Sequence, residues 1–308
     1  MSFEPIGAAG NTAEAEDRGV AAPRFRLPPA THIGVVRLQV ADIARSLAYY
    51  ERVLGFRVVR RDDSGAAALG AAGSDAPILE LRERVGARPH PKRGQLGLFH
   101  FAILLPDRAS LGRLVRHLSE IGAYAGMSDH LVSEALYLTD PDGLGIEVYA
   151  DRPRTDWRYA GRELQMATIP LHVEDLMAAG GTERWTGMPN GTSIGHVHLH
   201  VGDLEKAAAF YHEALGFDKV VWSYPGALFL SAGGYHHHLG TNTWAAGAQP
   251  ATDEDARLVE WELVMPDAAS VSAAGASVEA SGGSVERSAD GSILARDPWG
   301  TAVRLVSR

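Results

Sequence analysis

An internal repeat constrains this chain more than any other feature of its sequence. Residues 34–42 and 195–203 read alike, and each run continues to a Leu-Gly-Phe, at 54–56 and at 215–217. Each copy reads as an alternating strand, an Asp that can cap a helix N-terminus, and an amphipathic helix that ends at a glycine. The two halves of the chain are therefore copies of one another.

A second, weaker repeat lies inside each half. Residues 99–107 correspond to residues 259–267, and both read as a strand that leads into a helix. These units also close alike, with Asp-Pro-Asp-Gly at 140–143 and Asp-Pro-Trp-Gly at 297–300, each a tight turn that feeds a strand. The sequence therefore predicts four tandem units, each made of a strand, a helix and further strands.

The repeat also sets the expected domain boundaries. A chain of 308 residues exceeds a typical single core, so two domains are expected. We predict a disordered leader over residues 1–29, a first domain over 30–151, a connector over 152–191 and a second domain over 192–308. Within the connector, the pattern at 173–179 predicts a short helix.

Composition excludes several classes of function. The chain has no cysteine, which rules out disulfides, zinc–thiolate sites, iron–sulfur clusters and a cysteine nucleophile. The net charge is 29 − 38 = −9, and no basic stretch is interleaved with aromatics, so nucleic acid is not an expected partner. No apolar run is long enough to span a bilayer, and the first residues do not read as a secretory signal. We expect a soluble, cytoplasmic protein that does not bind a membrane.

The repeated unit resembles that of the vicinal oxygen chelate superfamily. Within that superfamily, the chain from about Thr31 to its C-terminus is similar to the bacterial catechol 2,3-dioxygenases. The resemblance implies an α+β fold in which four tandem βαβββ modules form two concave mixed β-sheet cups. The stretches that carry it are residues 99–107, 133–137, 140–147, 195–201 and 233–238.

The resemblance also implies a metal held by two His and one Glu in one of these cups. In ring-cleaving members the ligands come from the first strands of two units and the last strand of one. The first two units lack the second His, and the last two would place a cationic Arg beside the ion. Only the middle two units supply a full set, so we predict that they pair and bind one metal. The first-strand candidates are Val35, His100, His196 and Glu260, and the last-strand candidates are Glu147 and Arg304.

The predicted ligands His100, Glu147 and His196 suit Fe(II), with Mn(II) as the alternative, and leave one face of the ion open. A small aromatic diol and dioxygen can bind there together. We therefore predict an extradiol ring-cleaving dioxygenase of the catechol 2,3-dioxygenase type. In the other cup, Glu260 is expected to pair with Arg304, and no second metal is expected.

The resemblance assigns three further residues to catalysis. His237, in the run of histidines at 236–238, aligns with the catalytic His that takes a proton from the substrate, and imidazole has a suitable pKa for that role. Tyr137 lies ten residues before Glu147 (147 − 137), where the family places a Tyr that hydrogen-bonds the substrate oxygen. His130 occupies the loop from which the family supplies another acid–base His.

Other histidines surround the predicted site. His196, His198 and His200 alternate along one strand and are expected on one face of it. His198 and His200 are therefore interpreted as groups that orient the ligands or contact substrate, or as polar residues in a wet cavity. His238 is placed in the same group.

Three alternative functions remain open at this point. A hydroquinone or chlorohydroquinone ring-cleaving dioxygenase would keep the same iron site. A glyoxalase-like metal-dependent lyase would typically bring a fourth protein ligand, often a second Glu. A non-catalytic sequestering protein of the bleomycin-resistance kind would use the cup without chemistry. In each case the sheet edges favour a homo-oligomer.

Overall fold

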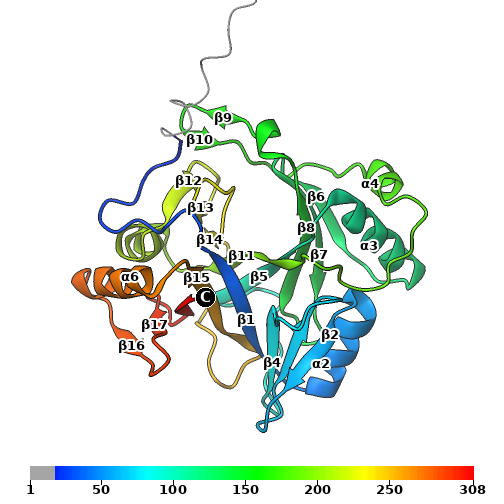
Figure 1. The fold of residues 1–308 in the computed structure, drawn as a ribbon, viewed down its shortest axis with the longest axis horizontal. Helices are drawn as coiled ribbons and strands as arrows, with labels where there is room; N and C mark the ends of the chain where they lie inside the picture. Colours follow the sequence, from blue (N-terminus) through cyan, green and yellow to red (C-terminus); the bar gives the residue numbers. More distant parts are fainter. Residues whose placement is uncertain (1–17) are drawn as a thin grey trace, which may run out of the picture.

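The computed structural model describes residues 18–308, so residues 1–17 of the predicted leader lie outside the described residues. Two eight-stranded mixed sheets form the body of the molecule, with helices on their outer sides (Figure 1). Each sheet takes one βαβββ unit from each half of the chain. The predicted α+β fold of four units in two cups is confirmed.

The first sheet is built by the two middle units, as the ligand pattern predicts. Its order is β12-β13-β14-β11-β5-β8-β7-β6. The central strands β11 and β5 are antiparallel, β14 runs parallel to β11, and β8 runs parallel to β5. Its strands are β5 (Gly97–Leu104), β6 (Gly126–Asp129), β7 (Ser133–Thr139), β8 (Gly145–Asp151), β11 (Ser193–His200), β12 (Asp218–Val221), β13 (Ala227–Ser231) and β14 (Leu239–Asn242).

The second sheet repeats this arrangement with the first and fourth units. Its order is β16-β17-β18-β15-β1-β4-β3-β2, again with an antiparallel central pair flanked by parallel strands. Its strands are β1 (His32–Val40), β2 (Arg57–Arg61), β3 (Ala67–Gly70), β4 (Leu79–Glu83), β15 (Arg257–Met265), β16 (Val285–Arg287), β17 (Ile293–Arg296) and β18 (Ala302–Ser307). A separate ribbon pairs β9 (Tyr159–Ala160) with β10 (Glu163–Leu164).

The helices begin where the sequence places their caps. The Asp42 carboxylate accepts a hydrogen bond from the Arg45 N–H at 2.9 Å, and Asp203 accepts one from Lys206 at 2.8 Å. Gly55, at the end of the first helical unit, has φ +78°, which few residues other than glycine adopt. In the described part of the chain, no helix is both long and apolar enough to cross a membrane. The helices are α2 (Ile43–Tyr49), α3 (Arg108–Glu120), α4 (Val173–Ala179), α5 (Leu204–Ala208) and α6 (Ala268–Ala280), with π-helical turns η1 (Tyr50–Leu54) and η3 (Ala209–Ala214) and a 3₁₀ turn η2 (Arg154–Asp156).

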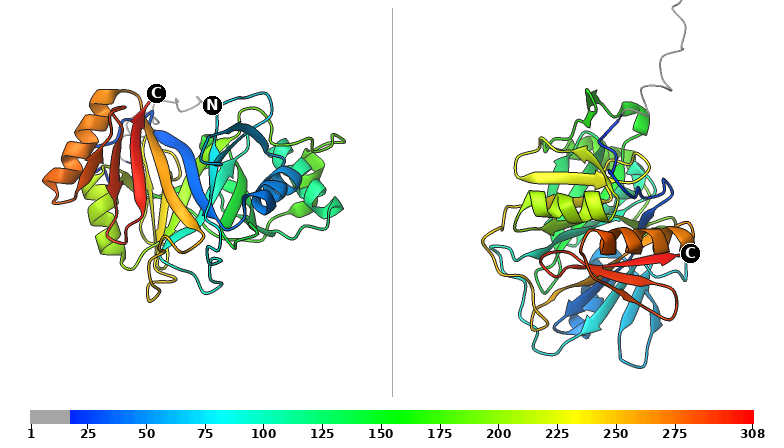
Figure 2. Two further views of the ribbon diagram at one scale, coloured as in Figure 1. Left: turned by 90° about the horizontal axis from the view of Figure 1, so that it is seen from below. Right: turned by 90° about the vertical axis from the view of Figure 1, so that its left-hand side faces the viewer.

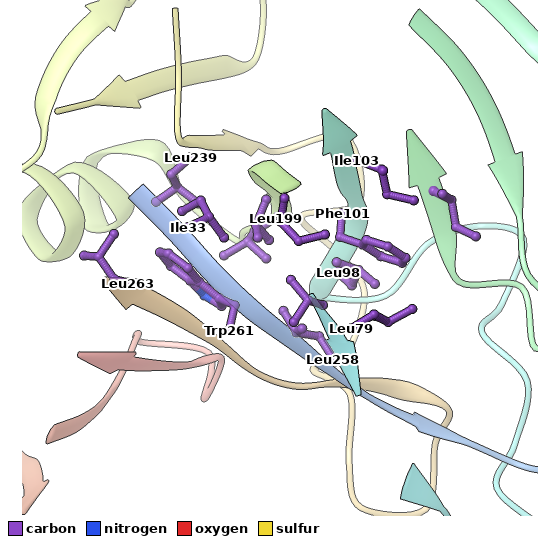
Figure 3. Close-up of a cluster of buried hydrophobic side chains, with 14 of the residues drawn as sticks. Ile33, Leu79, Leu98, Phe101, Ile103, Leu199, Leu239, Leu258, Trp261 and Leu263 are labelled. Atoms are coloured by element: carbon purple, nitrogen blue, oxygen red, sulfur yellow. The ribbon is translucent and has the colours of Figure 1, made fainter. Parts of the chain in front are cut away.

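The two sheets share one hydrophobic core. Alternation along β11 sends Val197 and Leu199 into this core and leaves His196 and His198 for the opposite face. Figure 3 shows Leu199 and Phe101 from the first sheet gathered with Trp261 from the second. In Figure 2, α6 lies on the outer side of the strands β16 to β18. The concave faces of both sheets therefore remain free for polar groups.

Residues 18–29 differ from the disordered leader that the sequence predicts. Leu27 is buried, and the Arg26 guanidinium forms a bidentate ion pair with the Asp218 carboxylate. Val20 exchanges backbone hydrogen bonds with Lys219 on β12. One apolar side chain, one ion pair and this backbone pairing thus hold the segment against the second half of the chain.

Candidate metal centre

Three neighbouring strands carry the predicted ligands. His100 lies on β5, Glu147 on β8 and His196 on β11, and all three side chains are buried. The register pairs Ala102 of β5 with both Glu147 and His196, so these two side chains flank a small residue. One ligand atom from each of the three residues lies within 4.8 Å of the others. The structure therefore contains the buried metal site that the middle pairing predicts.

The local contacts fit a cation at this point. His100 Nε2 lies 2.9 Å from Glu147 Oε2, and His196 Nε2 lies 3.2 Å from the same oxygen. Although His100 Nε2 lies this close to the carboxylate, the angles do not allow a hydrogen bond, and the atom has no other partner among the described residues. A buried polar atom without a partner is costly, and here it is aimed at a carboxylate and a second imidazole. A bound divalent metal would satisfy all three groups.

The protonation states of these groups suit metal binding. Burial alone would raise the pKa of Glu147, but the adjacent His196 and His100 imidazoles hold that pKa well below its usual range. Burial lowers the pKa of His196 to about 4. Near neutral pH the set is thus one carboxylate with a neutral His196, and these are the forms that ligate metals.

A cavity of about 290 Å³ opens onto the ligands. Its aromatic walls are Phe99, Tyr224, Phe229 and Trp244, and connector residues 166–168 close one side. Trp244 is 52% exposed, which places it at the solvent side of the cavity. His130, Tyr137, His198 and His237 also line this space.

Tyr137 and His130 form a hydrogen-bonded pair in the cavity. Tyr137 lies directly opposite Glu147 in the β7–β8 register, which explains the ten-residue spacing. The Ala167 carbonyl can only accept, so His130 Nδ1 donates to it at 2.8 Å, and Nε2 accepts from the Tyr137 hydroxyl at 2.6 Å. Burial, with the Glu147 charge, raises the pKa of Tyr137 well above its usual range, so the hydroxyl keeps its proton.

His198 and His200 occupy different positions, although alternation predicts one shared face. A bulge interrupts the pairing of β11 with β5 between His198 and Leu199, and Phe99 is the extra residue. The bulge turns Phe99 into the cavity beside His100. His200 packs against the Phe99 ring, with ring centroids 4.7 Å apart, and does not line the cavity. Asn242 accepts from His200 Nδ1 at 2.7 Å and donates to His198 Nε2 at 2.9 Å.

The three consecutive histidines also separate. His237 lines the cavity, and its ring lies 4.0 Å from that of His196. His238 lies outside the cavity, where its Nδ1 accepts a hydrogen bond from the Ala232 N–H at 3.2 Å. His236 is fully buried behind His237 and contacts Asp151. Sequence reasoning missed Asp151, although it shares a strand face with Glu147 at a spacing of four residues.

Comparisons with known proteins agree with this arrangement. Paired βαβββ units with a buried His, His, Glu set define a metal-dependent class of cup-shaped proteins. The model of the Glyoxalase/Bleomycin resistance protein/Dioxygenase superfamily matches residues 32–148 and 193–305. The chain belongs to this superfamily.

Two curated relatives cover different shares of the chain. Catechol-2,3-dioxygenase of Bacillus subtilis (strain 168) is 48% identical over 240 residues, which are 77% of this chain and 83% of that protein. A lactoylglutathione lyase of Neisseria meningitidis serogroup A is 28% identical over 117 residues, 36% of this chain and 83% of its own. The dioxygenase thus matches both halves, whereas the lyase matches about one.

Two solved structures share the fold. A candidate dioxygenase from Bacillus subtilis aligns with a TM-score of 0.63 at 15% identity and covers 92% of this chain and 86% of its own. Glyoxalase I of Zea mays aligns with a TM-score of 0.52 at 20% identity and covers 90% and 92%. At these identities the likeness concerns the fold alone.

Proposed function

We propose that this protein is an extradiol ring-cleaving dioxygenase of the catechol 2,3-dioxygenase type, with Fe(II) held by His100, Glu147 and His196. The buried set of two imidazoles and one carboxylate that opens on a substrate-sized cavity carries this proposal. The 48% identity with a catechol-2,3-dioxygenase supports it. When bound, Fe(II) supplies the redox chemistry that lets a catechol react with dioxygen. Mn(II) is the alternative ion.

The cavity residues supply the acid–base chemistry. We assign His237 as the base that accepts a proton from a substrate hydroxyl, because it lines the cavity beside the ligand His196. Tyr137 carries a protonated hydroxyl opposite Glu147, and because its one proton is donated to His130, its oxygen can accept a hydrogen bond from a substrate hydroxyl. His130 accepts from that hydroxyl and orients it. The aromatic walls exclude water from the reacting groups.

The cavity also selects its substrate by size and charge. Its volume of about 290 Å³ lies at the lower end of ligand pockets, at roughly 300 Å³, which favours a single ring. Among its described lining residues there is no Arg or Lys. The bound metal would be the only cation, and the two catechol oxygens would occupy it, so a substrate carboxylate would lose its hydration without a cationic side chain as partner. The proposed substrates are neutral, monocyclic catechols with small apolar substituents.

The test is oxygen uptake by the anaerobically purified protein loaded with Fe(II). Catechol and 4-methylcatechol should consume dioxygen and give a yellow ring-opened semialdehyde, and His100→Ala should abolish both signals. The carboxylate-bearing 3,4-dihydroxybenzoate should react at least about tenfold more slowly, because tenfold corresponds to only about 1.4 kcal/mol of discrimination. Circular dichroism of His100→Ala checks that the variant is folded.

Other outcomes of this experiment point to other functions. Uptake with hydroquinones and not with catechols would keep the iron site and replace the substrate. Turnover of a hemithioacetal without oxygen would favour a glyoxalase-like lyase, but the described metal-ligand cluster contains three residues and no second Glu. Substrate binding without turnover would indicate a sequestering protein. The expected homo-oligomer and cytoplasmic location remain predictions, and light scattering tests the first.

A further inference from the structure

We propose that Asp151 and His236 are positioning residues that set the tautomer of His237. Together they hold the ring proton of His237 on Nδ1 and leave Nε2 as a bare acceptor. This inference rests on the base role proposed above for His237. It extends the site from the cavity to a carboxylate at the C-terminal end of β8.

Two short contacts connect the three residues. Asp151 Oδ1 lies 2.9 Å from His236 Nε2, and His236 Nδ1 lies 2.8 Å from His237 Nδ1. The His236 side chain is 0% exposed and that of Asp151 is 28% exposed. Since His236 is sealed from solvent, water does not compete for either of its nitrogens. The chain of contacts therefore runs from the surface to the cavity through side chains alone.

The Asp151 carboxylate at the end of this chain of contacts determines which ring nitrogen of each histidine carries the proton. A carboxylate only accepts hydrogen bonds, so His236 must carry its proton on Nε2 and donate it to Asp151. A neutral imidazole has one ring proton, so His236 Nδ1 is then an acceptor. The only group that faces it at 2.8 Å is His237 Nδ1, which must therefore carry the proton of His237. His237 Nε2 is then left unprotonated, as the proposed base role requires.

Neighbouring residues hold Asp151 in place. It follows Glu147 and Tyr149 on one face of β8, so the strand that positions the ligand also positions the carboxylate. The Tyr235 hydroxyl donates to Asp151 Oδ1 at 3.2 Å and contacts the Tyr149 hydroxyl at 2.6 Å. The Trp157 ring packs edge-on against His236. This packing restricts the His236 ring to one orientation.

The tautomer decides what His237 can do. With Nε2 bare, the imidazole can take a proton from a substrate hydroxyl, as the proposed reaction requires. The opposite tautomer would present an N–H there and could only donate. A carboxylate that fixes the tautomer of a catalytic imidazole through its other nitrogen is an established arrangement, and here a second imidazole lies between the two.

The test reads the tautomer directly. Full-length protein with ¹⁵N-labelled histidine is loaded with diamagnetic Zn(II), and long-range proton–nitrogen spectra report which ring nitrogen of His237 carries hydrogen. The spectrum of His237→Gln assigns the signals. Wild type should show a protonated Nδ1 and a bare Nε2. In Asp151→Asn the side-chain amide can donate to His236 Nε2, because the Tyr235 hydroxyl competes for the amide oxygen. His236 would then carry its proton on Nδ1 and donate it to His237 Nδ1, so the Nε2–H form of His237 should appear.

Kinetics with Fe(II) provide the second readout. Asp151→Asn should lower kcat about 10- to 100-fold, with KM changed less than about threefold, because substrate contacts are intact. A matched variant should leave both the tautomer and kcat near wild type. Asp156→Asn removes an exposed carboxylate from η2, five residues further along the chain and outside these contacts.

Two results would overturn the proposal. One is a wild-type His237 protonated at Nε2, which would mean that His236 is doubly protonated or turned. The other is an Asp151→Asn protein with an unchanged tautomer and unchanged kcat. Failure of the proposed function looks different, because the wild-type protein would then show the expected tautomer and consume no oxygen with catechols.

Discussion

The two cups of this molecule have the same scaffold but differ in how the charge of a buried carboxylate is compensated. The metal cup holds His100, Glu147 and His196 on the first sheet. The ion-pair cup holds Glu260 and Arg304 at the equivalent positions of the second sheet, with Val35 in place of the second His. Strand order and the central bulge are the same in both sheets.

The difference lies in where the positive charge comes from. Arg304 binds Glu260 with two hydrogen bonds of 2.7 and 2.8 Å, and Arg37 adds contacts with Glu260 and Glu262. The predicted Glu260–Arg304 pair is confirmed. In the metal cup, Glu147 faces imidazoles and no guanidinium among the described lining residues. One cup thus compensates its carboxylates within the chain, and the other leaves Glu147 for a cation.

The largest expected effect is on metal retention. Glu147→Gln removes the anionic ligand and should weaken Fe(II) affinity by more than about 100-fold, since even residues that only support a ligand affect affinity by about 10- to 100-fold. Glu260→Gln is the same change in the ion-pair cup and should leave one metal per chain. Metal analysis after anaerobic desalting measures both. Equal metal loss in the two variants would contradict the division of roles.

The next largest effect is on stability. Glu260→Gln leaves Arg37 and Arg304 partly uncompensated in a buried cluster and should lower the free energy of unfolding by about 3 kcal/mol at pH 7. Burial alone would raise the pKa of Glu260, but Arg304 and Arg37 hold that pKa below the ordinary value of 4.5. The stabilisation is therefore complete above pH 4.5 and is lost as pH falls through the lower folded-state pKa.

Urea denaturation of wild type and Glu260→Gln at a series of pH values measures this difference. The gap between the two proteins should be widest near neutral pH and close in acid. A gap that widens in acid would show that Glu260 is not held as a carboxylate. Asp156→Asn, which removes an exposed carboxylate, is the matched control, and its free energy of unfolding should equal that of wild type throughout the pH series.

The sequence predicts the parts of the site that the repeat contains. The resemblance to the vicinal oxygen chelate superfamily implies the ligand positions on the strands, and the elimination of incomplete ligand sets among them then predicts that His100, Glu147 and His196 come together. The bulge at Phe99 could not be predicted, because alternation assumes an uninterrupted ladder, and it is this bulge that separates His200 from the cavity. Residues 166–168 belong to the connector, which has no repeated partner to align with.

Contacts between distant segments also escape sequence reasoning. His236 and Asp151 meet only because β8 and the turn after β13 adjoin, which no local pattern encodes. Likewise, the burial of Leu27 depends on a surface formed by the second half of the chain. Periodicity reports which face a side chain takes, and the fold decides which faces meet.

The smallest predicted effect distinguishes two equivalent glycines. A Cβ on Gly195 would lie 1.7 Å from the Tyr149 hydroxyl oxygen, and one on Gly34 would lie 2.6 Å from Glu262 Oε2. Both alanine variants should lose about 1 to 3 kcal/mol of stability through overpacking. Gly195→Ala should also weaken metal binding, because displacement of Tyr149 shifts the neighbouring His196, whereas Gly34→Ala should not.

Thermal unfolding and metal titration of the two variants separate these contributions. The stability losses are expected to be similar, since each alanine meets a buried neighbour on the concave face of its own sheet. Metal affinity is expected to fall in one variant only. If Gly34→Ala also lost metal, the two cups would be coupled through their shared core, and the ion-pair cup would then support the metal site as well as the fold.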